Sequence, residues 1–123
     1  MIQLRTIVKV ADNTGVRRAA CFHVYGGYQK RYGRIGDIIA LSVKDAVPHS
    51  MVKKGEVLYA VIVRTRKEFK RKDGTYVRFG DNAVVIIDKK SKEPKGTRIF
   101  GPIPREIKSL GFTKIGSLAQ EVL

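Results

Sequence analysis

The chain has 123 residues, of which 43% are hydrophobic and 29% charged. It carries 25 lysines and arginines against 11 acidic residues, a formal net charge of +14 at pH 7. This length predicts a single domain over residues 1–123, and this charge predicts a polyanionic partner. Nucleic acid is favoured over a membrane surface, because the sequence has no apolar stretch of about 18 residues, no basic amphipathic helix and no lipidation signal.

The first third of the chain predicts a β-hairpin. The segment LRTIVKV alternates polar and apolar residues, which places Leu4, Thr6, Val8 and Val10 on one face. The segment ACFHVY alternates in the same way, and the intervening ADNTG supplies turn residues. The opening MIQLRTIVKV lacks the apolar core and cleavage site of a signal peptide. We therefore expect the folded domain to begin at the N-terminus and the protein to stay in the compartment where it is made.

The middle of the chain predicts strands that are buried on both faces. GDIIALSVKDAV and GEVLYAVIV are near-continuous apolar runs, separated by a loop that contains Pro48 and Gly55. Such strands are typical of a closed or sandwiched sheet. DGTYVRFGDNAVVIID then predicts two more strands, with Asp73 and Gly74 in the turn of a hairpin.

The last quarter of the chain has a different pattern. Residues 93–104, EPKGTRIFGPIP, contain three prolines, which predicts a shaped, exposed basic loop rather than a central strand. REIKSLG predicts a short helix that ends at Gly111, and SLAQEVL predicts another, because Ser117 and Gln120 have the spacing of a capping box.

The predicted fold is mainly β: a small five-stranded antiparallel β-barrel over about residues 1–90, with a projecting β-ribbon over about 64–79. A Pro/Gly loop region and short C-terminal helices follow over about 91–123.

The candidates for catalysis are few. The histidines are His23 and His49, and the one cysteine, Cys21, forms no internal disulfide and fits a reducing compartment. Cys21 and His23 share a strand face and could touch. No third residue completes a catalytic set of nucleophile, base and orienting group, so we favour a part-buried structural thiol beside a surface imidazole. The glycine-rich stretches do not match a phosphate-binding loop. The sequence therefore predicts a non-enzymatic protein with no metal, no cofactor and no small-molecule substrate.

The basic segments indicate where RNA binds. The segment RTRKEFKRK has six cations in nine residues against one acid, Glu68; these cations are Arg64, Arg66, Lys67, Lys70, Arg71 and Lys72. Such an excess of like charge destabilises a hairpin with little core of its own, so we expect RNA phosphates to neutralise it. The further candidate cations for RNA binding are Arg17, Arg18, Lys30, Arg31, Lys53, Lys54 and Arg78. Tyr28 and Tyr32 either stack on bases or line the barrel rim, and both readings stay open.

One segment also carries a family resemblance. Residues 60–86, AVIVRTRKEFKRKDGTYVRFGDNAVVI, resemble the signature of the universal large-subunit ribosomal protein family number fourteen. VADNTGVRRAACFHV, GDIIALSVKDAVP, EPKGTRIFGPIPREI and SLAQEVL resemble further segments of that family in the same order, so the resemblance covers the whole chain. Gln120, where many relatives have proline, and the additional Tyr28 are small departures.

The resemblance implies a five-stranded β-barrel with a ribbon, and a structural protein of the large ribosomal subunit. It implies direct binding of large-subunit rRNA, a bridge to small-subunit rRNA, and neighbouring large-subunit ribosomal proteins. It also implies a face where a ribosome-silencing factor docks, which by position includes Thr97, Arg98 and Lys114. The expected location is the ribosome, in the cytoplasm or in an organelle with its own ribosomes.

Two other classes of function are compatible with a small basic β protein. A free single-strand RNA-binding module of the OB type requires several exposed aromatic residues on one sheet face, for which the sequence gives weak support. A small basic nuclease requires a general acid and a general base, which the sequence hardly offers.

Overall fold

The computed structural model describes residues 2–27, 30–48, 50, 52–88 and 90–123. Tyr28 and His49, both discussed above, lie outside the described residues.

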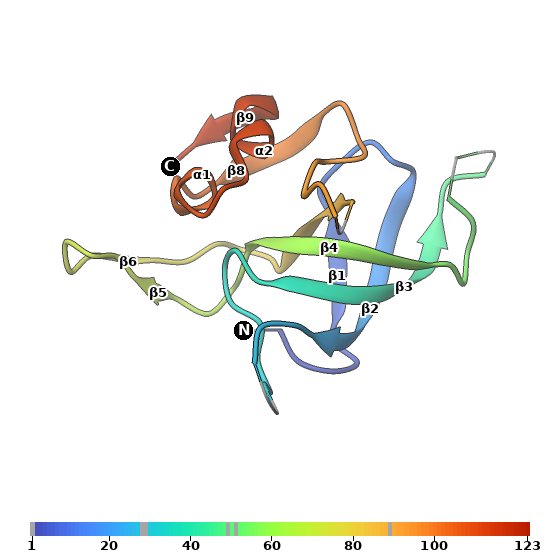
Figure 1. Cartoon of the computed structure of the whole chain (residues 1–123), viewed down its shortest axis with the longest axis horizontal. Coiled ribbons are helices and arrows are strands. Elements are labelled where there is room, and N and C mark those ends of the chain that lie inside the picture. Colours follow the sequence, from blue (N-terminus) through green and yellow to red (C-terminus); the bar gives the residue numbers. More distant parts are fainter. Residues whose placement is uncertain (1, 28–29, 49, 51, 89) are drawn as a thin grey trace.

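A closed five-stranded barrel forms the body of the molecule (Figure 1). Its strands close in the order β1-β2-β3-β4-β7. Their bounds are β1 Ile7–Val10, β2 Val16–Val24, β3 Ile38–Ala46, β4 Val57–Arg64 and β7 Ala83–Ile87. The predicted mainly β barrel is therefore confirmed. Four of its seams are antiparallel as expected, but β1 and β7 run parallel, so the barrel is mixed rather than wholly antiparallel.

Strands β4 and β7 separate two hydrophobic clusters. Ala60 and Ile62 of β4 point into the barrel, where they pack with residues such as Leu41. The alternate residues Val61 and Val63 belong to a second cluster with the C-terminal elements. Because side chains alternate across a strand, a strand covered on both sides must be apolar at nearly every position. The predicted two-sided burial is confirmed for β4, where it explains the continuous apolar run. In β3 it holds only over residues 39–41, and Lys44 of that strand is exposed.

The N-terminal strand is shorter than expected. Leu4 is 58% exposed, and β1 begins only at Ile7. Arg5 has a φ of 69°, and the Thr6 amide donates to the Gln3 carbonyl at 3.1 Å. A left-handed residue in a turn interrupts the two-residue period. The prediction that Leu4 shares the buried face of Val8 is therefore wrong.

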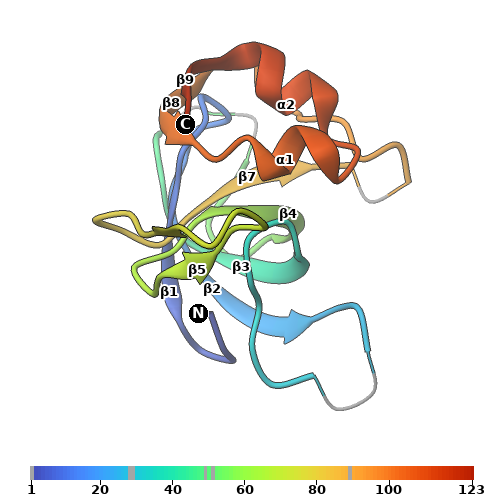
Figure 2. The same ribbon diagram turned by 90° about the vertical axis from the view of Figure 1, so that its left-hand side faces the viewer.

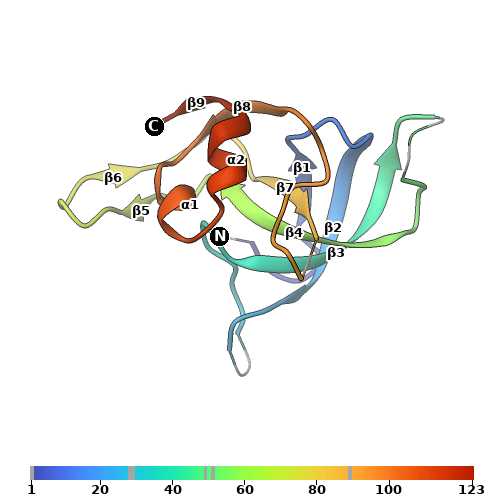
Figure 3. The same cartoon turned by 45° about the horizontal axis from the view of Figure 1, so that its top comes forward.

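A C-terminal unit covers one side of the barrel (Figures 2 and 3). It consists of β8 Ile99–Ile103, α1 Glu106–Ser109, α2 Thr113–Leu118 and β9 Ala119–Val122. Ile107 of α1 and Ile115 of α2 are fully buried, and they pack in the cluster that includes Val61, Val63 and Val85.

Two predictions for this C-terminal unit are wrong. Residues 99–103 form a strand rather than a loop, in a two-stranded parallel sheet with β9. This sheet accepts Pro102 because a strand in a two-stranded sheet has an edge where a missing N–H needs no partner. The segment SLAQEVL contains a strand rather than a second helix, and α2 already begins at Thr113. The Ser117 hydroxyl donates to the Lys114 carbonyl at 2.9 Å inside α2, so Ser117 caps no helix. The helix predicted over REIKSLG is confirmed as α1, and Gly111 after it has a φ of 99°.

The predicted ribbon is present as a two-stranded sheet, β5 Phe69–Lys70 and β6 Tyr76–Val77. It projects from the barrel at the end of β4, on the side where the C-terminus lies (Figure 1).

Candidate nucleic-acid interface

The tip of the ribbon is a hydrogen-bonded turn. The Arg71 amide donates to the Thr75 carbonyl at 2.8 Å. The Asp73 carboxylate accepts from the hydroxyl and the amide of Thr75, at 2.7 and 3.0 Å. These two bonds, with nearby Arg105 and Arg71, lower the pKa of Asp73 below its ordinary value. The turn is therefore fixed by its own residues, and it holds the ribbon cations on a defined scaffold.

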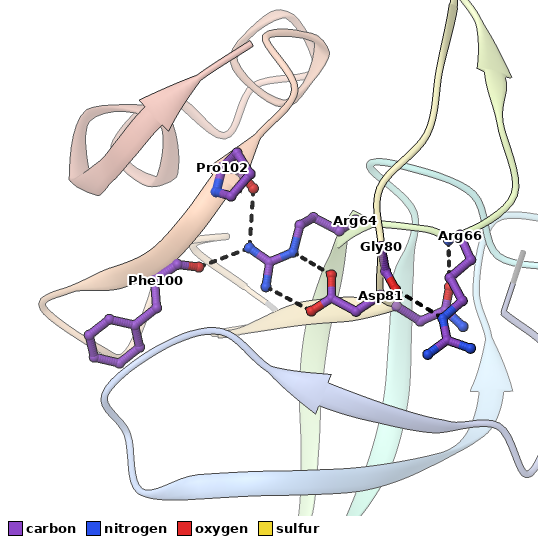
Figure 4. Close-up of polar contacts among 7 residues, drawn as sticks. Arg64, Arg66, Gly80, Asp81, Phe100 and Pro102 are labelled. Carbon is purple, nitrogen blue, oxygen red and sulfur yellow. Dashed lines mark hydrogen bonds and ion pairs between the residues drawn. The ribbon is translucent and has the colours of Figure 1, made fainter.

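Arg64, the first cation of the ribbon sequence, is not available as a surface charge. It is 5% exposed, and its guanidinium lies between the barrel and the C-terminal unit (Figure 4). It forms two bonds to the Asp81 carboxylate, Nε–Oδ1 at 2.9 Å and Nη2–Oδ2 at 3.3 Å. Its Nη1 donates to the carbonyls of Phe100 and Pro102 at 2.9 and 3.2 Å. Arg64 thus connects three parts of the chain: β4, the segment that precedes β7, and β8. Its charge is satisfied within the protein rather than offered to RNA.

Two further predicted cations, Arg71 and Lys30, are partly buried against partners within the chain. Arg71 Nε lies 2.7 Å from Glu106 Oε1, and its Nη2 donates to the Leu123 carbonyl. Lys30 Nζ lies 2.9 Å from Asp37 Oδ2, and both side chains are about three-quarters buried. The expectation that an outside anion supplies the whole counter-charge is therefore wrong in part, because Asp81, Glu106 and Asp37 supply some of it.

The other predicted RNA-binding cations lie on the surface. They come from four places: β2, the segment before β3, the β3–β4 loop, and the ribbon with its base. These exposed residues are Arg17, Arg18, Arg31, Lys53, Lys54, Arg66, Lys67, Lys70, Lys72 and Arg78. Arg18 lies 3.7 Å from Asp45, and Lys67 lies 3.0 Å from Glu68, in pairs that are well exposed to solvent. Exposed pairs of this kind contribute little, so these cations are free to exchange a partner for a phosphate.

The predicted docking residues Thr97, Arg98 and Lys114 are all exposed, but they differ in their contacts. The Thr97 hydroxyl accepts from Asn13 Nδ2 at 2.8 Å. The amides of Thr97 and Arg98 both donate to Asn13 Oδ1, at 2.8 and 3.1 Å. Lys114 Nζ lies 2.7 Å from Glu93 Oε1, in an exposed ion pair. Asn13 therefore fixes the backbone of the Thr97 loop from the other end of the sequence.

Asn13 and Asp12 support this surface through hydrogen bonds, although the sequence showed them only as turn residues. Asp12 is 5% exposed, and its Oδ1 accepts from the Thr14 hydroxyl at 2.6 Å. Its Oδ2 accepts from the Ile86 amide of β7 at 2.9 Å. Burial raises the pKa of Asp12 above its ordinary value, although the bonds from Thr14 and Ile86 oppose the shift. The turn after β1 thus holds both the barrel seam and the Thr97 loop.

A groove of about 1140 Å³ opens along β1 and the turn that follows it. Lys9, Arg17, Arg18 and Arg66 line it together with apolar side chains, among them Phe100. Lys9 and Phe100 were not among the predicted site residues. The alternation along β1 could have indicated an outward-facing Lys9, whereas the position of Phe100 depends on contacts remote in sequence.

A comparison with known protein families shows what kind of protein carries these surfaces. The model of the family described as Ribosomal protein L14p/L23e matches residues 1–123, the whole chain. The chain belongs to this family. As an L14p/L23e protein it is a structural constituent of the large ribosomal subunit, and its place is the ribosome. The family resemblance predicted from residues 60–86 is confirmed.

The L14p/L23e family is a class of structural proteins rather than of enzymes. Cys21 is fully buried while His23 is exposed, because the β2 register shifts between them. Burial raises the pKa of the Cys21 thiol, so it stays protonated and unreactive. Among the described residues there is no cluster of three or more His, Cys, Asp or Glu side chains that could hold a metal ion. Likewise, no helix in the part of the chain that the structure describes has the length and apolarity to span a membrane.

Proposed function

We propose that the chain binds large-subunit rRNA directly, through the ribbon and the exposed cations around the barrel. The observation that carries this proposal is the ribbon. Its exposed cations are Arg66 and Lys67 just before β5, Lys70 in β5, and Lys72 in a turn that is fixed by its own hydrogen bonds. Membership in a family of large-subunit proteins supports rRNA as the polyanion.

The internal partners of Arg71 support a defined direction for the ribbon. Its contacts with Glu106 and the Leu123 carbonyl hold the ribbon against the C-terminal unit before any RNA is present. A pre-positioned cationic ribbon loses less conformational entropy on binding than a free one. Phosphate contacts position a protein without reading base sequence, so specificity comes from the shape of the folded RNA.

The Thr97 loop and Lys114 form a second proposed surface, which contributes to the bridge with small-subunit rRNA and serves as the docking face of a ribosome-silencing factor. Its support is the exposure of Thr97, Arg98 and Lys114, together with the Asn13 bonds that keep the loop in one conformation. Neighbouring large-subunit proteins complete the environment that we propose. We propose the cytoplasm, the family's usual setting, as the location of this ribosome, with an organelle as the alternative.

The experiment that tests the RNA proposal replaces Lys67, Lys70 and Lys72 with Gln. Binding of the variant to a large-subunit rRNA fragment is measured over a range of salt concentrations. Each lost phosphate contact lowers the slope of log K against log salt by about 0.7 to 0.9, so the slope should fall by roughly two to three. The stability of the free protein should hold or rise slightly, because the change relieves like-charge repulsion.

A charge-matched control variant replaces Lys90, Lys92 and Lys95, which are exposed between β7 and β8. It loses the same net charge away from the ribbon, so it should lower the slope clearly less. If the ribbon variant changes affinity and slope no more than this control does, the ribbon is only a solvated surface. Retention on large subunits through a moderate salt wash separates a ribosomal constituent from a free RNA-binding module.

A further inference from the structure

Phe100 is a solvent-exposed aromatic residue on a rigid backbone. Its neighbours in β8, Ile99 and Ile103, are buried, whereas Phe100 is 46% exposed. Its amide donates to the Ala11 carbonyl at 2.6 Å, and its carbonyl accepts from Arg64 Nη1 at 2.9 Å. The ring points away from the Arg64 guanidinium (Figure 4).

The residue after Phe100 fits the same arrangement. Gly101 has a φ of 82°, which favours glycine, and a Cβ there would lie 2.4 Å from Arg64 Nη1. The chain thus uses a buried arginine and a glycine to hold an apolar ring in solvent. An exposed phenylalanine whose backbone is bonded on both sides is suited to stacking, because little conformational entropy is lost when a flat group covers it.

The surroundings of the ring combine apolar surface with cations. Phe100 lies in the groove along β1, with Ile7, which is 53% exposed. Lys9, Arg17 and Arg66 line the same groove and are exposed. Its volume, about 1140 Å³, is above the roughly 300–1,000 Å³ that is usual for drug-sized ligands, which suits an extended ligand.

The acids of the groove are occupied inside the protein. The Asp12 carboxylate accepts from Thr14 and Ile86, and the Asp81 carboxylate is bound by Arg64. Asp45 lies 3.7 Å from Arg18 in an exposed pair. The charge that the groove presents to a ligand is therefore positive, which favours an anionic polymer over an apolar protein segment.

Among RNA structures, an unpaired segment fits this groove better than a duplex. A duplex offers phosphates to the cations but keeps its bases stacked on one another, so it leaves the ring uncovered. A single strand offers phosphates and free base faces together. We propose that the groove binds a single-stranded segment of RNA, with one base stacked on Phe100 and its phosphates on Lys9, Arg17 and Arg66. This inference rests on the proposed RNA-binding function and adds a site separate from the ribbon.

The test uses the full-length protein with two probes, a short oligoadenylate that carries a fluorescent adenine analogue and a fully paired RNA duplex. Stacking on an aromatic side chain contributes a factor of about 5 to 150 in affinity for each base. Phe100→Ala should therefore weaken oligoadenylate binding by about that factor and abolish the fluorescence quenching that accompanies stacking. Duplex binding should change less than about twofold, and Phe100→Tyr should bind as the wild type does.

The matched control is Phe22→Ala, which removes a phenylalanine that is 47% exposed on β2, outside the groove. It should leave both affinities unchanged. An effect of Phe100→Ala no larger than that of Phe22→Ala, or an equal loss on both probes, overturns the stacking site. If the ribbon variant still weakens binding in that case, RNA binding by the chain stands and only the groove assignment fails. If neither variant weakens binding, the proposed function itself fails.

Discussion

Replacing Arg64 with Met should loosen the C-terminal unit from the barrel. The substitution removes the donor that joins Asp81 to the carbonyls of Phe100 and Pro102. An unsatisfied buried acceptor costs about 1 to 3 kcal/mol, and the substitution leaves two part-buried carbonyls without their donor. The Asp81 side chain is 33% exposed and becomes hydrated in the variant, so loss of its ion pair with Arg64 adds little to the cost. Removal of a buried charge offsets part of the cost, which gives an expected net destabilisation of about 2 to 4 kcal/mol.

Urea unfolding of the free protein measures this change, and the melting temperature should fall by roughly 10 °C. Hydrogen exchange shows which part of the molecule loses stability. The amides of Phe100 and Leu123, which donate to Ala11 and Ile103, should exchange faster, whereas the amide of Ile62 in the barrel should keep its protection. A loss below about 1 kcal/mol, or equal acceleration at Ile62, would refute the assignment of Arg64 as the link between the two parts.

Three further predictions concern the turn after β1 and the surface that it supports. The double variant Arg98→Ala with Lys114→Ala should leave stability and subunit assembly unchanged, because both residues are exposed. It should weaken docking of a silencing factor in a pull-down, and unchanged docking removes this face from the proposal. Asn13→Ala should weaken the same docking, because it releases the Thr97 loop. Asn13→Asp should largely preserve docking, since a carboxylate still accepts from the amides of Thr97 and Arg98. NMR shifts of those two amides show whether each variant keeps the hydrogen bonds. Because the pKa of Asp12 is raised on folding, its contribution to stability is greatest below its ordinary value of 3.8 and is lost as the pH rises through the folded value. The stability of the wild type minus that of Asp12→Asn should therefore fall as the pH rises from about 3 to 7, and a difference that rises with pH contradicts the shift.

The barrel could be predicted from the sequence because its pattern is local. Nearly every residue of β4 and β7 is apolar, and this directly reflects contact with a cluster on each side. The strand β9 could not be predicted in this way. Its partner β8 lies about twenty residues earlier, and the capping-box pattern at Ser117 competed with it. Local signals specify turns and short helices, but a two-stranded pairing is decided by tertiary contacts.

The sequence identified the basic residues of the candidate site, but it could not show which of them are exposed to solvent and which are buried against internal partners. Arg64 and Arg66 lie two residues apart in the same basic run, yet one is buried and the other exposed. A register irregularity between Ile62 and Arg64, at the end of β4, accompanies this difference. Asp81 and the Phe100 carbonyl then complete the burial of Arg64. The pattern of a single strand contains neither this register irregularity nor the two partners of Arg64.

The parallel pairing of β1 with β7 has a consequence for folding during synthesis of the chain. Because synthesis runs from the N-terminus, β1 lacks one neighbouring strand until residues 83–87 have been made. The outer face of β4 and β7 stays uncovered until Ile103, Ile107 and Ile115 have been made. A nascent chain of this kind exposes an unpaired strand edge and apolar side chains for most of its synthesis, which favours aggregation. The excess of positive charge along the chain opposes this outcome, because like-charged chains repel one another. The exposed lysines and arginines thereby also help to keep unfinished copies of the protein apart.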